Sequence, residues 1–590
     1  MWTHCPKLDP ISDNIIVDYM KANSVLTVDL SSHDVGWSKM NDTASNFLGG
    51  RGLGARLYSQ DPRNADDPKN CVFICPGFLT GTSFPSISRS NIVSSSPHTG
   101  LLLSSSFGGH FGAYLKSQGI VAIQLTGVAE DWSYVVIDGK NTRIESADDL
   151  VGMSTYEVRE ALRKRFTGRS VSIASIGVAG ENLVKYAIAQ FDSRAAGRSG
   201  SGWHFGFKKL KAIVVMKNDS PYVESHKAEM KRILSHLRER KAKHELDNNI
   251  DKYCSAPYVE YANEVQAFPA SNYRRNFVSE EEMKGYDMKK YEAMTVRSEA
   301  CWSCPLACTR ILNSTYSDQE VKGPEYETLW SFGVNCDNVD LDVITECNRI
   351  CDEYGLDTIS TGNVLGWYKE CVDENVVEDV WSPDRMFALI RMIGEREGIG
   401  ADLAEGVVKA SIHLGYGKDK VAHSKGLELP AWDPRTALGM ALCYATGPTG
   451  GDHCKGWTVL DDVDDGKDRL TVKNKVERAI ERQNYSAVID SVGVCIFADF
   501  MYDFDLLAEC VSVFSESDIS RVELERMGDD IFQVERNINR KLGLTNDADV
   551  LPERIIGYDV EVNGQTFKLT QSMFDEMKEK YYEKRGWSKG

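Results

Sequence analysis

Hydrophobic and polar residues alternate in short runs along the first 215 residues of the chain. Examples are Val25–Leu30, Tyr134–Ile137 and Ala212–Met216, which Gly- and Ser-rich segments separate. Alternation with a period of two is typical of β-strands, and Gly and Ser are typical of the turns between them. The pattern predicts a β-rich, sandwich-like N-terminal domain within an α+β fold.

Helical patterns dominate after residue 216. The first is a charged segment, Glu224–Leu246, and its change in composition predicts a domain boundary near residues 216–222. Further helices are predicted at Asp342–Tyr354, Met386–Arg396, Ala401–Leu414, Asp518–Leu542 and Phe574–Gly586. A chain of 590 residues is too long for a single core. We expect three domains: a β-rich domain at 1–216 and two mainly helical domains at 217–420 and 421–590.

The composition is that of a soluble globular protein, with 42% hydrophobic and 26% charged residues. The net charge of −19 argues against a general nucleic-acid or anionic-membrane binder, because such surfaces need an excess of Lys and Arg. The first residues lack a basic start followed by an apolar run, and no apolar stretch is long enough to span a bilayer. We therefore expect no signal peptide, no membrane span and a cytoplasmic location.

Three of the fifteen cysteines fall within eight residues, in a C-x2-C-x3-C pattern formed by Cys301, Cys304 and Cys308. This spacing lets one loop direct three thiolates at an iron–sulfur cluster or a metal ion. The distant Cys495 is the candidate fourth ligand, which the fold would have to bring in. A reduced compartment fits this pattern better than disulfides do. Several other cysteines lie among apolar residues and are predicted to be small buried hydrophobic residues: Cys71, Cys75, Cys347, Cys351 and Cys443.

A short signature, D-x-x-G-[LV]-[DC], occurs twice, at Asp352–Asp357 and at Asp490–Cys495. Alone, each copy would indicate a helix end with a capping glycine. The second copy ends in the candidate cluster ligand, and this pairing favours ligand sites that use the carboxylates and a glycine for close approach. The glycine-rich segment Gly49–Gly54 lacks the G-x-G-x-x-G spacing, so it does not predict nicotinamide binding.

These motifs and several others, in their order along the chain, resemble the tungsten-containing aldehyde ferredoxin oxidoreductase family. The resemblance extends from about Val25 to the C-terminus. Besides the cysteine motif and both D-x-x-G copies, the matching segments are 48–56, 77–82 with Arg89, 96–100, 108–112, 180–183, 194–198, 323–328, 429–435 and 451–453.

The resemblance implies a cofactor of two pyranopterin dithiolenes that hold one tungsten or molybdenum ion, with Mg²⁺ joining the pterin phosphates. All four dithiolene sulfurs bind the metal, so no protein cage for it is expected. Matching positions imply phosphate contacts by Arg89 and Arg194, and Mg²⁺ contacts by the carbonyls of Ser106 and Ala195. The positions that match pterin contacts are Asp352, Asp357, Asp490, Val494 and Lys455. The resemblance assigns a [4Fe–4S] cluster to Cys301, Cys304, Cys308 and Cys495.

The activity implied by the resemblance is oxidation of aldehydes to carboxylic acids, with electrons passing through the cluster to ferredoxin or an iron–sulfur partner subunit. Tyr326, Glu327 and His453 match the active-site residues of the family. A Glu in a partly apolar pocket has a raised pKa that suits general acid–base catalysis. From its local sequence alone, Glu327 would be an ordinary charge at a helix start after Pro324.

Three departures from the family pattern affect what the resemblance implies. Trp432 stands where Tyr is usual, which leaves the substrate open, and the segment 199–206 replaces a Gly-rich one. Some members join two subunits through a metal on an E-x-x-H motif, but the matching positions here are Glu346 and Arg349. A homodimer or a hetero-oligomer would therefore form without that metal.

Two alternatives remain open. The first is the catalytic subunit of a tungsten-dependent aryl-CoA reductase of the benzoyl-CoA type, which uses the same cofactor scaffold in the reductive direction. The second is a non-catalytic protein whose four cysteines hold structural zinc or an iron–sulfur cluster.

Overall fold

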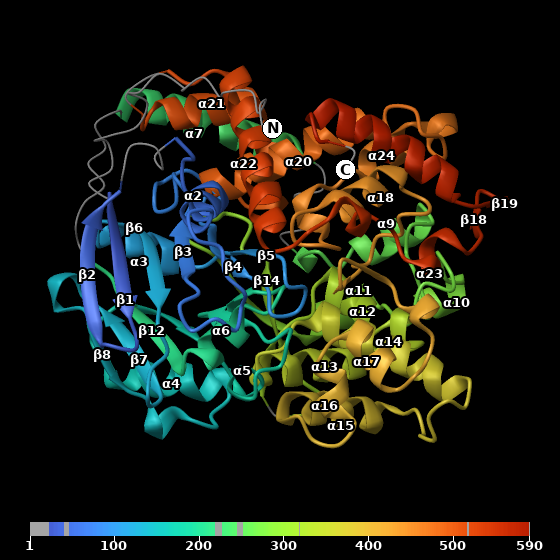
Figure 1. Ribbon diagram of the computed structural model, residues 1–590, viewed down its shortest axis with the longest axis horizontal. Coiled ribbons are helices and arrows are strands. Elements are labelled where there is room, and N and C mark those ends of the chain that lie inside the picture. Colours follow the sequence, from blue (N-terminus) through green and yellow to red (C-terminus); the bar gives the residue numbers. More distant parts are fainter. Residues whose placement is uncertain are drawn as a thin grey trace, which may run out of the picture.

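The computed structural model describes residues 23–40, 46–218, 227–244, 252–317, 319–515 and 518–588. Two six-stranded sheets form most of the N-terminal region, and helices dominate the rest (Figure 1). The expected α+β fold class is confirmed.

The two large sheets share one topology. The first has the order β2-β1-β6-β3-β4-β5 and the second, read from its other edge, has β8-β7-β12-β9-β10-β11, so the second repeats the first six strands later. In each sheet one strand pair is parallel, β1 with β6 and β7 with β12, and the other pairs are antiparallel. The strands are β1 (Ser24–Asp29), β2 (Asp34–Lys39), β3 (Val72–Pro76), β4 (Ser90–Ser95), β5 (Leu102–Phe107), β6 (Ile120–Thr126), β7 (Ser133–Ile137), β8 (Arg143–Ser146), β9 (Val171–Ser175), β10 (Ala189–Phe191), β11 (Arg194–Ala196) and β12 (Leu210–Met216).

Alternating side chains explain how the sheets pack. Leu26 and Val28 of β1 share one core with Ile213 and Val215 of β12, so the two sheets bury their inner faces together. The outer faces are covered by helices α2 (Gly50–Tyr58) and α4 (Thr155–Arg165). Short helices complete this region: α3 (Phe111–Ser117), α5 (Val178–Glu181) and α6 (Ser201–Phe207). A strand that is buried on both faces is apolar at most positions, and this accounts for the apolar run of β12.

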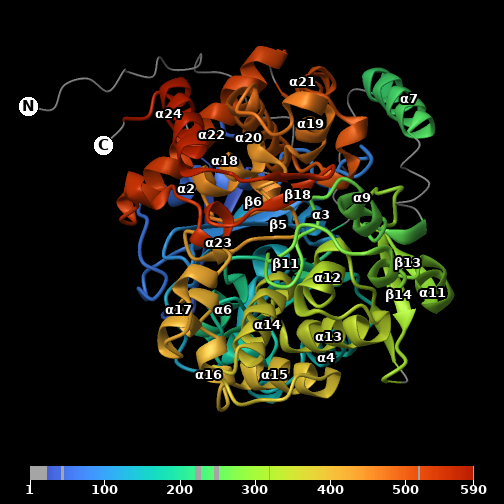
Figure 2. The ribbon, with the colours of Figure 1, turned by 90° about the vertical axis from the view of Figure 1, so that its right-hand side faces the viewer.

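Figure 2 shows the helices of the helical part, whose buried side chains belong mainly to two further cores. Its helices are α7 (Lys227–Lys243), α9 (Tyr258–Glu264), α10 (Glu280–Met283), α11 (Met288–Met294), α12 (Tyr326–Ser331), α13 (Leu341–Tyr354), α14 (Thr358–Asp373), α15 (Pro383–Glu395), α16 (Gly400–Leu403), α17 (Val407–His413), α18 (Leu438–Thr446), α19 (Val459–Asp464), α20 (Lys475–Val492), α21 (Phe504–Ser512), α22 (Arg521–Lys541), α23 (Glu553–Ile556) and α24 (Gln571–Arg585). The small strands are β13 (Thr295–Glu299), β14 (Thr309–Asn313), β15 (Glu320–Lys322), β16 (His423–Ser424), β17 (Leu427–Glu428), β18 (Val560–Val562) and β19 (Gln565–Phe567).

The predicted strands and most predicted helices are present, with two differences. The expected helix Ala401–Leu414 is two helices, α16 and α17, because Gly406 between them has a left-handed φ of 88°. Of the expected helix Glu224–Leu246, helix α7 is described, whereas 224–226 and 245–246 lie outside the described residues, as does part of the boundary predicted near 216–222. Of the five cysteines predicted to be buried, Cys71 is only half-buried.

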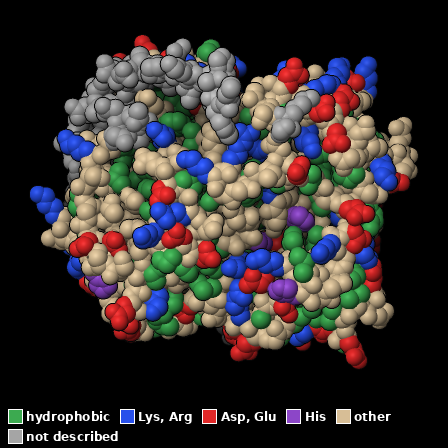
Figure 3. Space-filling model, viewed as in Figure 1, with side chains coloured by type: hydrophobic (Ala, Val, Ile, Leu, Met, Phe, Trp, Pro, Cys, Tyr) green, Lys and Arg blue, Asp and Glu red, His purple; other side chains and the backbone are tan. Residues whose placement is uncertain are grey.

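None of the described helices combines the length and the apolar character that a membrane span requires. On the face of the molecule seen in Figure 3, basic and acidic side chains are interspersed. This face therefore offers no broad surface of one charge sign, in agreement with the mixed charges of the sequence.

Candidate active site

A cavity lies where the N-terminal sheets meet the helical part. It encloses about 1780 Å³ of space outside the protein atoms, including the part that is open to solvent. Its lining comes from distant parts of the sequence, from Ser88 to Asp499. The enclosed volume that compares with other pockets is about 350 Å³, at the lower end of the usual range for small-molecule sites, about 300–1,000 Å³.

All four predicted cluster cysteines line this cavity. Cys301, Cys304 and Cys308 lie in the loop between β13 and β14. Cys495 is brought beside them through Ser86, whose N–H donates to the carbonyl of Ser303 and whose carbonyl accepts from the N–H of Cys495 at 3.0 Å. The main chain of the N-terminal region thus joins the two distant parts of the cysteine set.

The spacing of the four thiols favours a group larger than a single ion. Four sulfurs bound to one tetrahedral zinc at about 2.3 Å would lie about 3.8 Å apart. Within the described part of the chain, no three of these sulfurs lie within 4.8 Å of one another. The arrangement fits a multi-iron cluster, in which each thiolate binds a different iron.

Arg89 supplies positive charge to this cysteine group. Its guanidinium donates a hydrogen bond to Sγ of Cys495 at 3.0 Å. Burial raises the pKa of the Cys495 thiol to about 12, and the nearby Arg89 acts against this increase. A cation at this place favours the thiolate, the form in which cysteine binds metal.

Both D-x-x-G copies are helix ends. Gly355 caps α13 and Gly493 caps α20, and both are left-handed, with φ values of 76° and 103°. In each copy the glycine N–H and the next N–H donate to the same carbonyl, of Cys351 in the first and of Ile489 in the second. The helix-end interpretation of the signature is therefore right for the backbone, whereas its ligand role stays a prediction.

Each helix end attaches to one half of the duplicated N-terminal region. Leu356 forms a β-bridge with Ala187, after β9, and Val494 forms one with Ile87, after β3. The last position of each signature also meets an arginine from that half. Arg198 donates to Asp357 at 3.3 Å, and the Arg89–Cys495 contact is its counterpart. The cavity thus has two corners of similar construction.

Glycine is needed where the second corner closes. A Cβ on Gly77 would lie 2.3 Å from Cα of Gly493, and a Cβ on Gly493 would lie 2.4 Å from Oγ1 of Thr80. At Gly77 the nearest atoms are backbone, so no side chain fits there without a backbone shift, and at Gly493 the hydroxyl of Thr80 would have to move. The end of α20 and the loop after β3 can therefore touch only through glycine.

The predicted cofactor contacts divide into two sets. Arg89, Arg194, Ala195, Asp352 and Asp357 line the cavity, whereas Ser106, Asp490, Val494 and Lys455 are not part of its lining. In the second set, Lys455 pairs with Asp490 at 3.1 Å. Ser106 and Ala195 lie on β5 and β11, the edge strands that face each other across the two sheets.

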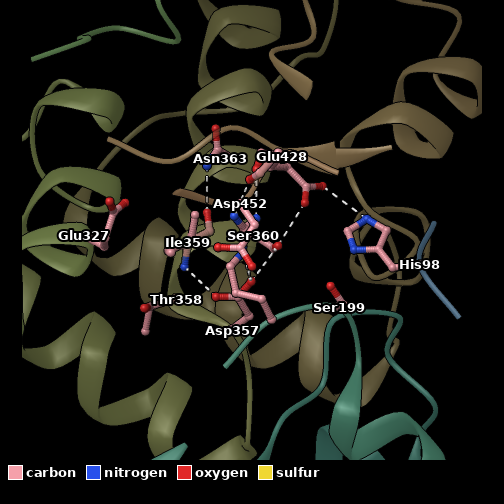
Figure 4. Close-up of polar contacts among 12 residues, drawn as sticks. His98, Ser199, Glu327, Asp357, Thr358, Ile359, Ser360, Asn363, Glu428 and Asp452 are labelled. Carbon is pink, nitrogen blue, oxygen red and sulfur yellow. Dashed lines mark hydrogen bonds and ion pairs between the residues drawn. The ribbon is translucent and has the colours of Figure 1, made fainter. Parts of the chain in front are cut away.

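Both carboxylates of the first copy are buried, and burial raises the pKa of each. Asp352 accepts from the amide of Gln190 at 3.0 Å. Oγ of Ser360 lies 2.7 Å from Asp357 and 2.9 Å from Glu428, so its single proton is shared between the two carboxylates, and Glu428 pairs with His98 at 3.4 Å. Figure 4 shows this chain of contacts running from Asp357 to His98.

Glu327 and His453 face each other in the cavity, 3.7 Å apart. One carboxylate oxygen of Glu327 accepts from the N–H of Ala431 at 2.9 Å, and the other has no hydrogen-bond partner. Burial raises the pKa of Glu327. For His453, burial lowers the pKa, but the neighbouring Cys454 and Glu327 outweigh it and raise the pKa to about 10.

Tyr326 also lines the cavity, but its hydroxyl donates to the carbonyl of Ala431 at 2.7 Å. Burial raises the pKa of Tyr326 well above its usual value, so the phenol stays protonated. Tyr326 and Glu327 together hold both polar groups of Ala431 and thereby fix the segment that carries Trp432.

Several residues that face the cavity are absent from the sequence-based prediction. Cys454 lies beside His453, with Sγ and Nε2 at 3.4 Å, and Arg198 bridges Asp357 to the carbonyls of Glu428 and Gly451. Arg198 lies in a segment that carried the resemblance, so that segment could have indicated it. Others include Tyr258, Lys322, Asn348 and Trp457, which no local motif marks.

Sequence models of a known family match almost the whole chain. The N-terminal domain of aldehyde ferredoxin oxidoreductase matches residues 25–217, and domains 2 & 3 of the same family match residues 232–590. The chain belongs to the aldehyde ferredoxin oxidoreductase family. The recognition made from the sequence is confirmed, and the protein is an oxidoreductase of this family.

Individual relatives agree with this assignment. The tungsten-containing aldehyde ferredoxin oxidoreductases of Pyrococcus furiosus and Thermococcus kodakarensis are each 34% identical to this chain, over 95% of it and 96% of their own length. The WOR-like subunit of aliphatic sulfonate oxidoreductase from Pyrococcus furiosus is 28% identical, over 74% of this chain and 75% of its own.

A solved structure has the same fold. It is the active site complex BamBC of benzoyl coenzyme A reductase in complex with 1,5-dienoyl-CoA. The TM-score is 0.84 over 97% of this chain and 95% of the other, with 20% sequence identity. At this identity the similarity establishes the fold and leaves the reaction open.

Proposed function

We propose that this protein oxidises aldehydes to carboxylic acids at a tungsten bis-pterin site, and that a [4Fe–4S] cluster passes the electrons to ferredoxin or an iron–sulfur partner. The observation that carries the proposal is one cavity that contains both the four-cysteine group and the Glu327–His453 pair. Family membership and relatives named as tungsten-containing enzymes support the choice of metal.

The residues fit an iron–sulfur cluster. Four thiols line one cavity, and Arg89 donates a hydrogen bond to one of them and offsets negative charge there. The neighbouring backbone leaves no spare room, because a Cβ on Gly108 would lie 2.9 Å from Sγ of Cys301. These observations support an iron–sulfur cluster, and metal analysis separates it from the zinc alternative.

The residues also fit a cofactor with two similar halves. Each half of the N-terminal region holds one D-x-x-G helix end with a buried carboxylate: Asp352 lines the cavity, whereas Asp490 pairs with Lys455 outside the lining. We propose that Asp352, Asp357, Asp490, Val494 and Lys455 hold the two pterins, and that Arg89 and Arg194 hold their phosphates. Mg²⁺ would bind the carbonyls of Ser106 and Ala195, whose strands adjoin.

When bound, the bis-pterin metal supplies a two-electron acceptor for the reaction R–CHO + H₂O → R–COOH + 2 e⁻ + 2 H⁺. The protein supplies the proton chemistry. Glu327 in its ionised form accepts a proton through its free oxygen, and burial raises its pKa towards the pH of the cell. His453, protonated below a pKa of about 10, donates a hydrogen bond that orients the carbonyl oxygen.

Electrons need a route to a partner at the surface. Ser303 and Pro305, within the cysteine loop, are exposed, so the cluster would lie just beneath the surface. A ferredoxin or an iron–sulfur subunit that docks over this loop would come within a short distance of it. Glu346 hydrogen-bonds to Arg349 through both carboxylate oxygens, so these positions offer no E-x-x-H metal bridge for an oligomer.

The benzoyl-CoA type of reductase is the alternative that the shared fold keeps open. The test is elemental analysis of anaerobically purified protein, followed by assays of aldehyde-dependent ferredoxin reduction and of benzoyl-CoA reduction. We expect about one tungsten and about four iron atoms per chain and activity with aldehydes. Activity with benzoyl-CoA alone would contradict the proposal, as would zinc in place of iron.

A further inference from the structure

One wall of the cavity is formed by four aromatic side chains: Tyr258, Tyr326, Trp432 and Trp457. We call this group the aromatic wall. Ring centroids lie 4.8 Å apart between Tyr326 and Trp432, 5.3 Å between Trp432 and Trp457, and 6.2 Å between Tyr258 and Trp432. The two tryptophans meet edge to face, at an angle of 68°. Trp432 therefore lies at the centre of the group and touches the other three rings.

Trp432 has a fixed position beside the acid–base pair. The N–H of the preceding residue, Ala431, donates to Glu327, and the carbonyl of Ala431 accepts from Tyr326. The carbonyl of Trp432 itself accepts from the hydroxyl of Tyr444 at 3.1 Å. The indole is 3% exposed, so packing holds it as well. A shift of the Trp432 ring would therefore also disturb the hydrogen bond between Ala431 and Glu327.

Three buried polar atoms of the cavity lining make no hydrogen bond, although one of them, Oε1 of Glu327, is the oxygen that lies 3.7 Å from His453. They are Nε1 of Trp457, Oε1 of Glu327 and Nδ1 of His453, all buried and without a hydrogen bond in the described structure. Native proteins rarely leave such groups unpaired, and each orphaned atom is costly unless a ligand satisfies it. Two of these atoms are donors when His453 is protonated, and they suit the oxygen of a carbonyl or carboxylate group.

We propose that the cavity binds an aromatic aldehyde, whose ring packs against Trp432 and Trp457 while its carbonyl points to Glu327 and His453. This inference rests on the function proposed above and names the substrate class of the same site. An aromatic ring gains edge-to-face contacts with such a wall, which a short alkyl chain does not make. The indole N–H of Trp457 would hold the carbonyl or the product carboxylate.

Trp432 and Trp457 have different parts in this proposal. Trp432 supplies the central ring of the wall, and Trp457 supplies a second ring and an indole N–H that makes no hydrogen bond. We expect kcat/KM of the holoenzyme to be about 10- to 100-fold higher for benzaldehyde than for acetaldehyde, from two ring contacts of ordinary strength.

Variants separate the two contributions. Trp432→Leu removes the central ring, and Trp432→Tyr is a milder change that keeps the test valid if the Leu variant fails to fold. Both should reduce the benzaldehyde-to-acetaldehyde ratio of kcat/KM, the Leu variant by at least fivefold. Trp457→Phe keeps a ring but removes the donor, so it should raise KM for benzaldehyde. Trp367→Phe is the matched control, because Trp367 is a buried indole with an unpartnered N–H outside the cavity lining.

A binding measurement provides a second readout that does not depend on turnover. Benzoate and acetate, the two acid products, would be titrated into the holoenzyme by calorimetry. We expect benzoate to bind at least tenfold more tightly than acetate, and Trp432→Leu to abolish most of the difference.

The outcomes separate the two proposals. Equal kcat/KM for the two aldehydes, unchanged in the Trp432 variants, would overturn the aromatic site and leave aldehyde oxidation standing. Preferred binding of benzoate that depends on Trp432, without turnover of any aldehyde, would support the aromatic site and overturn aldehyde oxidation. Loss of preference in Trp367→Phe as well would overturn the assignment of the effect to the aromatic wall.

Discussion

Glu327 combines three properties that a general base needs. It is buried, its pKa is raised by that burial, and one of its oxygens makes no hydrogen bond and lies 3.7 Å from Nε2 of His453. Replacing it by Gln keeps the acceptor for the N–H of Ala431 but removes the proton acceptor. We expect Glu327→Gln to lower kcat by about 10²- to 10⁴-fold while KM changes less than about threefold, as steady-state kinetics would measure.

The pH dependence of activity provides a second test of Glu327, because the direction of the change shows which protonation state is active. The basic form of Glu327 exists above its pKa, so activity should rise with pH through a value above the usual 4.5. His453 loses its proton near pH 10, and activity should fall there. In Glu327→Gln the acid limb should disappear, whereas Glu320→Gln, an exposed residue on β15, should keep it. An unchanged acid limb in Glu327→Gln would assign that limb to another group.

Cys304 allows a separate test of the cluster. Its thiol interacts with Ser86 Oγ at 3.2 Å, and burial raises its pKa. Cys304→Ala should reduce the iron content from about four atoms per chain towards zero and abolish electron transfer to ferredoxin, because three thiolates hold a [4Fe–4S] cluster poorly. Cys510→Ala, in the same hydrophobic core but away from the cavity, should retain its iron. Equal iron in both variants would rule out the ligand assignment.

At the scale of elements, the contact between the end of α20 and the loop after β3 depends on Gly493. An alanine there meets two penalties, a left-handed φ of 103° and a Cβ 2.4 Å from Thr80. Gly586 at the end of α24 is the matched control, since its φ of 64° is also left-handed but no atom lies within 4 Å of its Cβ. We expect Gly586→Ala to lower the free energy of unfolding by about 1 kcal/mol and Gly493→Ala by more than about 2 kcal/mol, as measured by urea unfolding. Equal decreases in the free energy of unfolding for the two variants would show that the close contact at Gly493 does not contribute to stability.

Local sequence patterns predicted the individual strands and helices well, but they did not predict which elements contact one another. Alternation predicted β1, β7 and β12, and apolar spacing predicted α13 and α22, because burial of one face imposes these periods. The split at Gly406 was missed, since an isolated glycine in a helical pattern is tolerated at many positions. The repeated topology of the two sheets was also missed, because strand order depends on contacts between distant segments.

For the whole molecule, the sequence predicted the parts of the site that motifs mark. Spacing and resemblance named the four cysteines and the Glu327–His453 pair, and the fold brings them into one cavity, while their roles stay predictions. The aromatic wall was not found as a group. Its members come from four separate segments, and single aromatic residues are more often core than site. Only the packing of the complete chain places Tyr258 beside Trp457.

The N-terminal and helical regions are joined by a buried ion pair. Both nitrogens Nε and Nη2 of Arg51 on α2 donate to the carboxylate of Glu535 on α22 at 2.8 Å, and neither side chain is exposed. Arg51 also lies 3.7 Å from Asp490 of the second D-x-x-G copy. This geometry couples the stability of the two regions at the point where they form one corner of the cavity.

Removing one partner of this pair leaves an uncompensated buried charge. We expect Glu535→Gln to lower the free energy of unfolding by about 3–5 kcal/mol, measured by urea unfolding with both circular dichroism and tryptophan fluorescence. Because α2 and α22 belong to different regions, both regions should lose stability together. The unfolding curves from circular dichroism and from fluorescence should therefore shift by the same amount. Glu525→Gln, which breaks an exposed pair with Arg521 on the same helix, should change stability little, since solvent screens that pair. A small effect in Glu535→Gln, or two separate transitions in the parent protein, would mean that the regions unfold independently.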